Sequence, residues 1–306
     1  MKKNQSKWKR RILRFLIVSS ILICIGGYIG LHHVAPYAIV MPPRANCTTL
    51  TPQNHDLQSD AITVRTHDSI LLKGYWVRSE MDSIRGVMIL VHGIGGCKES
   101  FLSLAKKFAS MGIESVLIDN RAHGESDGEF TTYGFKEKQD IAATVDLIKK
   151  KHPEVPIGIW GNSLGGAIAI QSMEYDKRIE FGIIESTFAD LSQIVYDYKK
   201  RLLYGIGIRF ASNIALKKAG EIADFPPEEV SPIASVKQIE QPIFFVHGDS
   251  DTSITYKYSQ QLYEQAKSKE KEFYLVKGAG HYGLAEKGGK EYVDRINAFI
   301  DQHLNN

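Results

Sequence analysis

Ser163 lies in the segment GNSLGG, residues 161–166, where glycines surround a single hydroxyl. The preceding run Ile157–Trp160 is apolar and of strand length, and the following run Leu164–Ile170 is small and apolar enough to begin a buried helix. A strand that turns directly into a helix strains the backbone, and glycine relieves crowding at such a corner. The pattern Gly-Xaa-Ser-Xaa-Gly therefore predicts a nucleophile elbow that exposes the Ser163 hydroxyl for acyl transfer. A helix-capping serine is the alternative.

A serine hydroxyl is a weak nucleophile unless a base removes its proton, and the base needs an acid to fix its tautomer. His281 lies in the glycine-rich segment KGAGHYG, residues 277–283, directly after an apolar run. Asp249 and Asp251 both follow the apolar run 242–246. These residues predict a triad of nucleophile, base and acid in the chain order Ser, Asp, His.

Six apolar runs of strand length alternate with helical patterns along the chain. The strand-like runs are 86–91, 114–118, 157–160, 181–184, 242–246 and 272–276, and the helical patterns cover 98–111, 135–151, 164–175, 188–200, 256–267 and 289–303. Before them, AITVRTHDSILLKGYWV (61–77) predicts two antiparallel strands joined near His67 and Asp68. We therefore predict an α/β fold with a mostly parallel eight-stranded sheet covered by helices on both faces. A TIM barrel fits poorly because the chain opens with a hairpin.

Five of these runs are followed by polar, glycine-rich segments. These segments are HGIGGCKES (92–100), DNRAHGESDG (119–128), the elbow, HGDSDTSI (247–254) and KGAGHYG. Ligands gather at the carboxyl ends of parallel strands. We expect the chemistry to lie at this edge of the sheet.

On the basis of these motifs, residues 60–304 resemble the α/β-hydrolase superfamily. The segments that carry the resemblance are LVHGIGG (90–96), DNRAHGES (119–126), GNSLGG, HGDSD (247–251) and GAGH (278–281). The family motif His-Gly-Xaa-Xaa-Asp ends in the catalytic acid, which implies Asp251 with Asp249 as its neighbour, and the family histidine matches His281. The chain is most similar to membrane-anchored enzymes of the serine aminopeptidase-like and lysophospholipase-like groups.

The resemblance also implies an oxyanion hole made of two backbone N–H groups. One would come from Leu164, the residue after the nucleophile, and the other from Ile94, which follows the His-Gly pair. We expect His92, Asp119, Arg121 and His123 to brace their loops rather than take part in the chemistry, and His303 to face solvent on the terminal helix.

A basic head precedes a long uncharged stretch at the N-terminus. Residues 1–14 contain seven Lys or Arg and no acid, and without them the remaining chain has 31 basic and 35 acidic residues, which argues against nucleic-acid binding. Residues 15–35 contain no charged residue and would form a helix of roughly 31 Å, close to the thickness of a bilayer. We predict an uncleaved single-pass anchor with a cytoplasmic N-terminus and the rest of the chain on the non-cytoplasmic side. A cleaved secretory signal is the alternative.

The cysteines are too few for a disulfide framework. Cys24 lies in the apolar stretch, and the spacing leaves open whether Cys47 and Cys97 pair. Taken alone, Cys97 is expected to be inert. No Cys/His cluster has zinc-ligand spacing, so we predict neither a metal site nor a cofactor.

The predicted organisation is an anchor over residues 1–35, an extended linker over 36–60 and a hydrolase domain over 61–306. The long connection at about 188–238 is interpreted as a small helical lid, with an ordinary packing insertion as the alternative.

We predict a serine hydrolase that cleaves acyl esters, as a carboxylesterase or lysophospholipase-like enzyme, through an acyl-enzyme. The expected partners are a small-molecule or lipid substrate and the membrane. A serine peptidase or amidase of the same fold is the alternative, and a non-catalytic binding module is a further one.

Overall fold

The structure, a computed structural model, describes residues 2–47, 49–202 and 205–304. Within these residues, eight strands form one sheet in the spatial order β1-β2-β4-β3-β5-β6-β7-β8. The strands are Ser59–Arg65 (β1), Leu71–Val77 (β2), Gly86–Val91 (β3), Ile113–Ile118 (β4), Ile157–Asn162 (β5), Phe181–Glu185 (β6), Ile243–Gly248 (β7) and Lys271–Val276 (β8). β2 pairs antiparallel with β1 and β4, and the other pairs are parallel. The predicted fold class and the opening hairpin are confirmed.

The sheet separates two hydrophobic cores. In β3, Val87, Ile89 and Val91 face one core, whereas Met88 and Leu90 face the other, and all five are fully buried. This alternation follows from the period of two in a strand, and it explains why a strand covered on both faces is apolar throughout.

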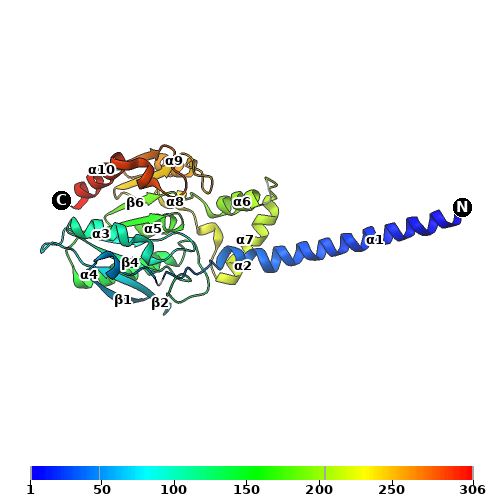
Figure 1. Cartoon of the computed structure of the whole chain (residues 1–306), viewed down its shortest axis with the longest axis horizontal. Coiled ribbons are helices and arrows are strands. Elements are labelled where there is room, and N and C mark those ends of the chain that lie inside the picture. Colours follow the sequence, from blue (N-terminus) through cyan, green and yellow to red (C-terminus); the bar gives the residue numbers. More distant parts are fainter. Residues whose placement is uncertain (1, 48, 203–204, 305–306) are drawn as a thin grey trace.

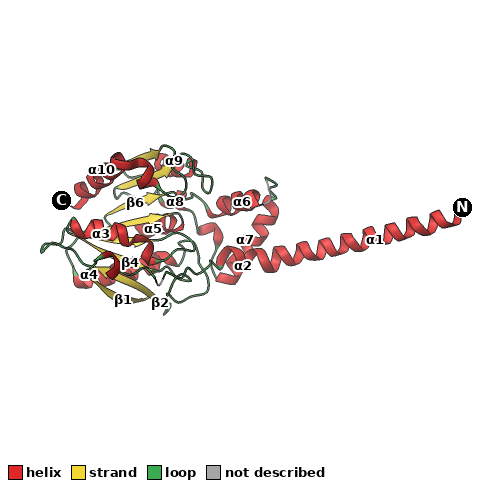
Figure 2. Ribbon diagram, in the orientation of Figure 1, coloured by secondary structure: helices red, strands yellow, loops and turns green. Residues whose placement is uncertain are grey.

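Helices cover both faces of the sheet (Figure 2). Helices α3 (Leu102–Ser110) and α10 (Leu284–Leu304) contribute to the core that contains Met88 and Leu90. Helices α4 (Glu137–Lys151), α5 (Leu164–Tyr175) and α9 (Lys257–Gln265) contribute to the opposite core. The predicted terminal helix begins five residues earlier than expected, and it is interrupted at Gly289, whose φ is 54°.

Further helices lie between β6 and β7. They are α6 (Leu191–Leu202), α7 (Arg209–Ala223) and α8 (Pro232–Ser235), with a short 3-10 helix at Pro227–Glu229. Helix α6 contacts α7, and its Arg201 donates hydrogen bonds to the backbone carbonyls of Thr252 and Ser253 at 2.6 and 2.9 Å. These helices therefore border the loop that follows β7, and their action as a lid stays a prediction.

The N-terminal helix α1 (Lys2–Ile29) projects from the folded body (Figure 1). A π-helix at Gly30–Val34 connects it to α2 (Ala35–Val40). By length and composition, the helical stretch Trp8–Val40 could cross a membrane, and the body of the protein does not bury its most apolar part.

The start of the predicted linker is helical rather than extended. Pro36 lies at the N-terminus of α2, where its missing N–H costs nothing, and Ile39 and Val40 are buried. Helix α2 packs on α7. The apolar side chains thus favour a helix despite the prolines that follow.

Candidate active site

Ser163 occupies a strained turn between β5 and α5. Its φ of 53° and ψ of −119° are unusual for a residue with a Cβ. Surrounding hydrogen bonds hold the turn, because the Ser163 N–H donates to the carbonyl of Glu185 at 2.8 Å and the Thr187 hydroxyl donates to the Ser163 carbonyl at 2.7 Å. A Cβ on Gly161 would lie 2.1 Å from the carbonyl oxygen of Gly165, so the corner requires glycine there. The predicted strained turn is present.

The structure brings Ser163, His281 and Asp251 together from three separate loops. The Oγ of Ser163 lies 3.0 Å from Nε2 of His281. The other ring nitrogen, Nδ1, lies 2.7 Å from Oδ2 of Asp251. With Nδ1 protonated, the carboxylate accepts that hydrogen and leaves Nε2 as a base directed at the hydroxyl. The His281 side chain is 12% exposed, which leaves the imidazole accessible from one side.

Hydrogen bonds satisfy both oxygens of the Asp251 carboxylate. Oδ1 accepts from the backbone N–H groups of Ser253 and Ile254, and Oδ2 faces Nε2 of the buried His247 at 3.2 Å as well as His281. Burial alone would raise the pKa of Asp251, but the hydrogen bonds from His247 and His281 outweigh it and hold the pKa well below its usual value. Asp251 is therefore ionised at neutral pH.

The sequence did not identify His247 as a residue of the site. Its Nδ1 lies 2.7 Å from the Ser259 hydroxyl and its Nε2 lies 2.9 Å from the carbonyl of Ile254, so the ring connects β7, α9 and the loop that carries Asp251. His247 begins the segment HGDSD, at the end of a buried strand and four residues before Asp251. That position could have indicated that it supports the acid.

Asp249 has a different role. Its Oδ1 accepts hydrogen bonds from the backbone N–H of Gly278 at 2.7 Å and from the Ser250 hydroxyl at 2.8 Å. Asp249 thus connects the loop after β7 to the loop that carries His281, and it makes no contact with the imidazole within the described residues.

The two residues predicted to form the oxyanion hole lie next to the elbow: Leu164 directly follows Ser163, and Ile94 lies in a turn that packs against it. Within the described chain, the N–H groups of Ile94 and Leu164 donate to no backbone carbonyl. A hydrogen bond of 3.0 Å from the Gly96 N–H to the Gly93 carbonyl closes the turn that contains Ile94. A Cβ on Gly93 would lie 3.2 Å from Cβ of Ser163, so this turn packs directly against the elbow. The arrangement suits a negative oxygen formed above Ser163.

The polar residues expected to brace the neighbouring loops do so. Asp119 accepts hydrogen bonds from the backbone N–H and the ammonium group of Lys98, at 2.7 and 2.9 Å. Arg121 forms a two-pronged ion pair with Asp140 at 2.6 and 2.7 Å. These pairs are buried and fix the positions of the loops after β3 and β4.

Three further histidines were expected to lie outside the chemistry, two in these loops and one on the terminal helix. His92 accepts a hydrogen bond from the Asn120 N–H, and Nδ1 of His123 lies 2.9 Å from the Arg121 carbonyl, so both brace turns as expected. The expectation for His303 is wrong. Its side chain is only 7% exposed, because its ring packs against Phe299 on the preceding turn of α10.

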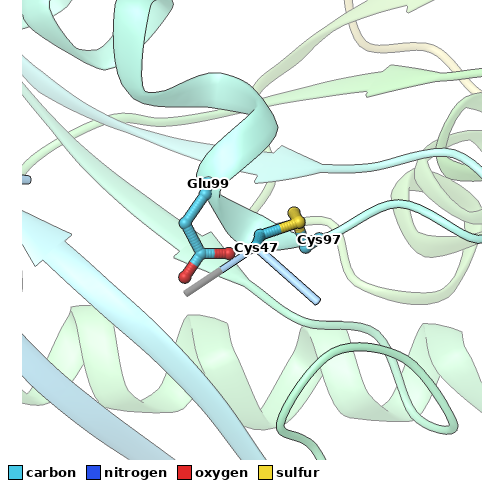
Figure 3. Close-up of side chains that lie close together, drawn as sticks. All are labelled: Cys47, Cys97 and Glu99. Carbon is cyan, nitrogen blue, oxygen red and sulfur yellow. A yellow bond between two sulfur atoms is a disulfide. The ribbon is translucent and has the colours of Figure 1, made fainter. Parts of the chain in front are cut away.

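A disulfide joins Cys47 to Cys97, with their Cα atoms 6.6 Å apart (Figure 3). The sequence left this pairing open. Glu99 lies beside the two sulfurs, and the three side chains have the composition of a small metal site. A disulfide offers no thiolate, however, so the oxidised pair lacks the ligands that a metal ion needs. Cys97 is therefore a structural residue of the loop that follows β3.

Comparison with known proteins gives a family match and several relatives. Residues 82–221 match the family described as serine aminopeptidase, S33. The chain is 28% identical to the uncharacterised protein YqkD of Bacillus subtilis over 236 residues, 75% of each protein. It is 30% identical to the monoglyceride lipase of Mus musculus over 130 residues, 42% of each.

Among solved structures, the Pyrococcus furiosus esterase Pf2001 is similar, with a TM-score of 0.71 and 23% identity. The alignment covers 87% of this chain and 98% of the esterase. At 23% identity, this structural similarity is evidence for the fold alone.

Proposed function

Because this chain is a serine hydrolase of the α/β-hydrolase superfamily, we propose that it cleaves acyl esters with Ser163 as nucleophile, His281 as general base and Asp251 as acid. The observation that carries the proposal is the continuous hydrogen-bond chain from the Asp251 carboxylate through the imidazole to the hydroxyl of a strained elbow. A structural serine would need neither the strain nor the aligned base.

Catalysis begins when Nε2 of His281 takes the proton of the Ser163 hydroxyl as Oγ attacks the ester carbonyl. The carboxylate of Asp251 stabilises the imidazolium that forms. The N–H groups of Ile94 and Leu164 stabilise the negative oxygen of the tetrahedral intermediate, and the loss of one such donor typically costs about 3 kcal/mol.

The intermediate collapses when the leaving alcohol takes the proton from Nε2, which leaves an acyl group on Oγ. Water then attacks this acyl-enzyme while Nε2 takes its proton, and Nε2 returns that proton to Oγ as the carboxylic acid leaves, which restores the free hydroxyl. The side chains of Ile94 and Leu164 are not needed for this role, since the donors are backbone groups.

The proposed substrate is a lipid or another acyl ester at a membrane surface. The relative from Mus musculus is a monoglyceride lipase, which supports an acyl glycerol or a similar lipid as the substrate. In this chain, helix α7 packs on α2, so the helices that border the site lie at the same end of the molecule as α1 (Figure 1). A helix that anchors the chain would therefore hold this end at the bilayer.

The end of the lid carries exposed apolar side chains that follow a basic stretch of α6. Ile206, Ile208 and Phe210 are 66%, 56% and 76% exposed, and Lys199 and Lys200 precede them on α6. Apolar side chains flanked by basic ones suit the interface of an anionic bilayer. We define Ile206, Ile208 and Phe210 as the lid tip, which we propose contacts the lipid surface.

In the proposed topology, the N-terminus is cytoplasmic and the hydrolase domain lies on the non-cytoplasmic side. The basic head before the apolar helix supports this orientation through the positive-inside rule. The Cys47–Cys97 disulfide supports the same side, because disulfides persist in oxidising compartments.

An amidase or aminopeptidase activity is the second candidate, because the matched family is described as serine aminopeptidase. The same acyl-enzyme chemistry serves an amine leaving group. Turnover of a panel of acyl esters, lysolipids and aminoacyl amides separates the candidates, and we expect the highest kcat/KM with the esters.

The test of the proposal is covalent labelling by a fluorophosphonate probe. We expect the wild type to be labelled and Ser163→Ala to be unlabelled, with ester turnover reduced by a factor of about 10⁴ or more while the fold survives. Ser186→Ala is the matched control, because Ser186 is also buried with a positive φ but its hydroxyl has no partner in the described chain. Labelling that persists in Ser163→Ala would refute the proposal.

A further inference from the structure

Residues 41–47, which we term the strap, connect α2 to the loop after β3. The strap begins where the N–H of Met41 bonds to the Tyr37 carbonyl at 2.8 Å, and it ends at the disulfide from Cys47 to Cys97. Between these points, Pro43 lies against Gly95, since a Cβ on that glycine would come within 3.2 Å of Cγ of Pro43. The strap therefore contacts the turn that contains Ile94.

Arg44 fixes the strap to a second loop of the active-site edge. Its guanidinium donates hydrogen bonds to four backbone carbonyls of the loop after β4. The acceptors are His123 at 3.3 Å, Gly124 at 3.0 Å, Ser126 at 2.7 Å and Gly128 at 2.5 Å. The fork geometry of a guanidinium suits such converging acceptors, and a lysine could not satisfy them all. Arg44 thus holds the strap in place independently of the disulfide.

The turn at 93–96 needs such an external restraint because three of its four residues are glycine. Glycine leaves the backbone more conformational freedom than any other residue. An oxyanion donor, in contrast, stabilises the transition state only if it is fixed before the reaction. One side of the turn packs on Ser163 through Gly93, and the other side packs on Pro43 through Gly95.

We propose that the strap is a positioning element for the oxyanion hole, in which the Cys47–Cys97 disulfide and Arg44 hold the Ile94 N–H in its productive orientation. The inference rests on the proposed function. It gives the segment between the membrane helix and the catalytic domain a role in the rate of reaction. It also makes activity depend on the oxidised state of the cysteine pair.

A positioning role and a merely stabilising role predict different kinetics. A donor that acts on the tetrahedral intermediate lowers kcat when it is misplaced and leaves the KM nearly unchanged. A staple that only stabilises the fold lowers the melting temperature, and kcat of the folded protein at low temperature stays the same. The split between kcat and KM therefore separates the two roles.

The experiment compares the full-length protein with Cys47→Ser, both in a Cys24→Ser background that removes the remaining thiol of the described chain. Far below the melting temperature, we expect kcat for a soluble ester to fall about tenfold to a hundredfold, with the KM changed by less than about threefold. Fluorophosphonate labelling of Ser163 should slow by a similar factor. Arg44→Lys should lower kcat in the same direction, because it keeps the charge but loses the fork.

Reduction of the folded protein provides a second route that needs no mutation. A dithiol transfers two electrons and two protons to the disulfide, giving two cysteine thiols and the oxidised, cyclic reagent. We expect reduction to lower kcat of the Cys24→Ser parent protein to the kcat of the Cys47→Ser variant. The kcat of Cys47→Ser itself should not change on reduction, and circular dichroism should show an intact fold in both. An unchanged kcat in both the variant and the reduced parent would overturn the strap proposal. Absence of labelling in the parent would instead overturn the proposed function.

Discussion

At the scale of single residues, two aspartates in the loop after β7 differ only in their contacts. Asp251 bonds to the His281 imidazole. Asp249 instead accepts a hydrogen bond from the backbone N–H of Gly278, in the loop that carries His281. We expect Asp251→Asn to lower kcat by a factor of about 10³ to 10⁴, because an amide cannot hold the correct imidazole tautomer. Asp249→Asn, the matched control, should change kcat by less than about tenfold. Steady-state kinetics on a soluble ester provide the measurement.

The pH profile adds a second readout for the same pair. The pKa of Asp251 is held below its usual value, so its carboxylate is ionised at every pH above about 4 and contributes no proton uptake there. As the pH falls toward about 4, ionisation of Asp251 should therefore add no step of its own to the pH profile of kcat/KM. The assignment is wrong if Asp249→Asn removes activity and Asp251→Asn leaves the profile unchanged.

At the scale of elements, the corner between β5 and α5 depends on close backbone contact. A Cβ on Gly165 would lie 2.0 Å from the carbonyl oxygen of Val91 in β3, so an alanine there must push the helix off the sheet. We expect Gly165→Ala to lower the free energy of unfolding by about 3 kcal/mol or more. Denaturant unfolding measures the loss.

Gly280→Ala serves as the control for this substitution. A Cβ at that position meets no atom within 4 Å, and its φ is not in the left-handed region. We expect its free energy of unfolding to stay within about 0.5 kcal/mol of the wild type. Equal destabilisation by both variants would contradict the steric explanation.

The elements of the catalytic domain could be predicted because periodicity is a local property of the sequence. A strand covered on both faces is apolar at every position, as β3 is, and the glycines of the elbow mark a backbone contact that only they permit. The contact between His281 and Ser163 could be expected once both were assigned to the carboxyl ends of parallel strands.

Other features could not be predicted because they depend on tertiary contacts. The pairing of Cys47 with Cys97 spans 50 residues and follows from where the strap crosses the turn at 93–96, which spacing does not encode. Helix α2 forms because Ile39 and Val40 find a surface to bury against, although the prolines around it favour extended chain. His303 looked polar in the sequence, yet its ring completes the packing around Phe299.

At the scale of the whole molecule, the N-terminal helix α1 and helices α2, α6 and α7 lie at one end of the domain (Figure 1). Helix α7 contacts both α2 and the π-helix that continues α1, so the insertion between β6 and β7 packs directly on the base of the N-terminal helix. Arg201 of α6 in turn donates hydrogen bonds to the loop after β7. If α1 spans a bilayer, these contacts keep helix α7 close to the point where the chain leaves it.

This arrangement predicts that the lid tip matters only for substrates presented in a bilayer. We expect the combined replacement of Ile206, Ile208 and Phe210 by serine to lower turnover of a long-chain acyl ester in anionic proteoliposomes about tenfold or more, because each apolar side chain that enters the interface contributes on the order of 1 kcal/mol. Turnover of a soluble short-chain ester by the same protein in detergent should stay within about twofold. Tyr175→Ser is the control, since Tyr175 is 53% exposed at the end of α5 and is not part of the lid tip. A parallel loss on both substrates would mean that the tip supports the fold of the lid rather than its contact with lipid.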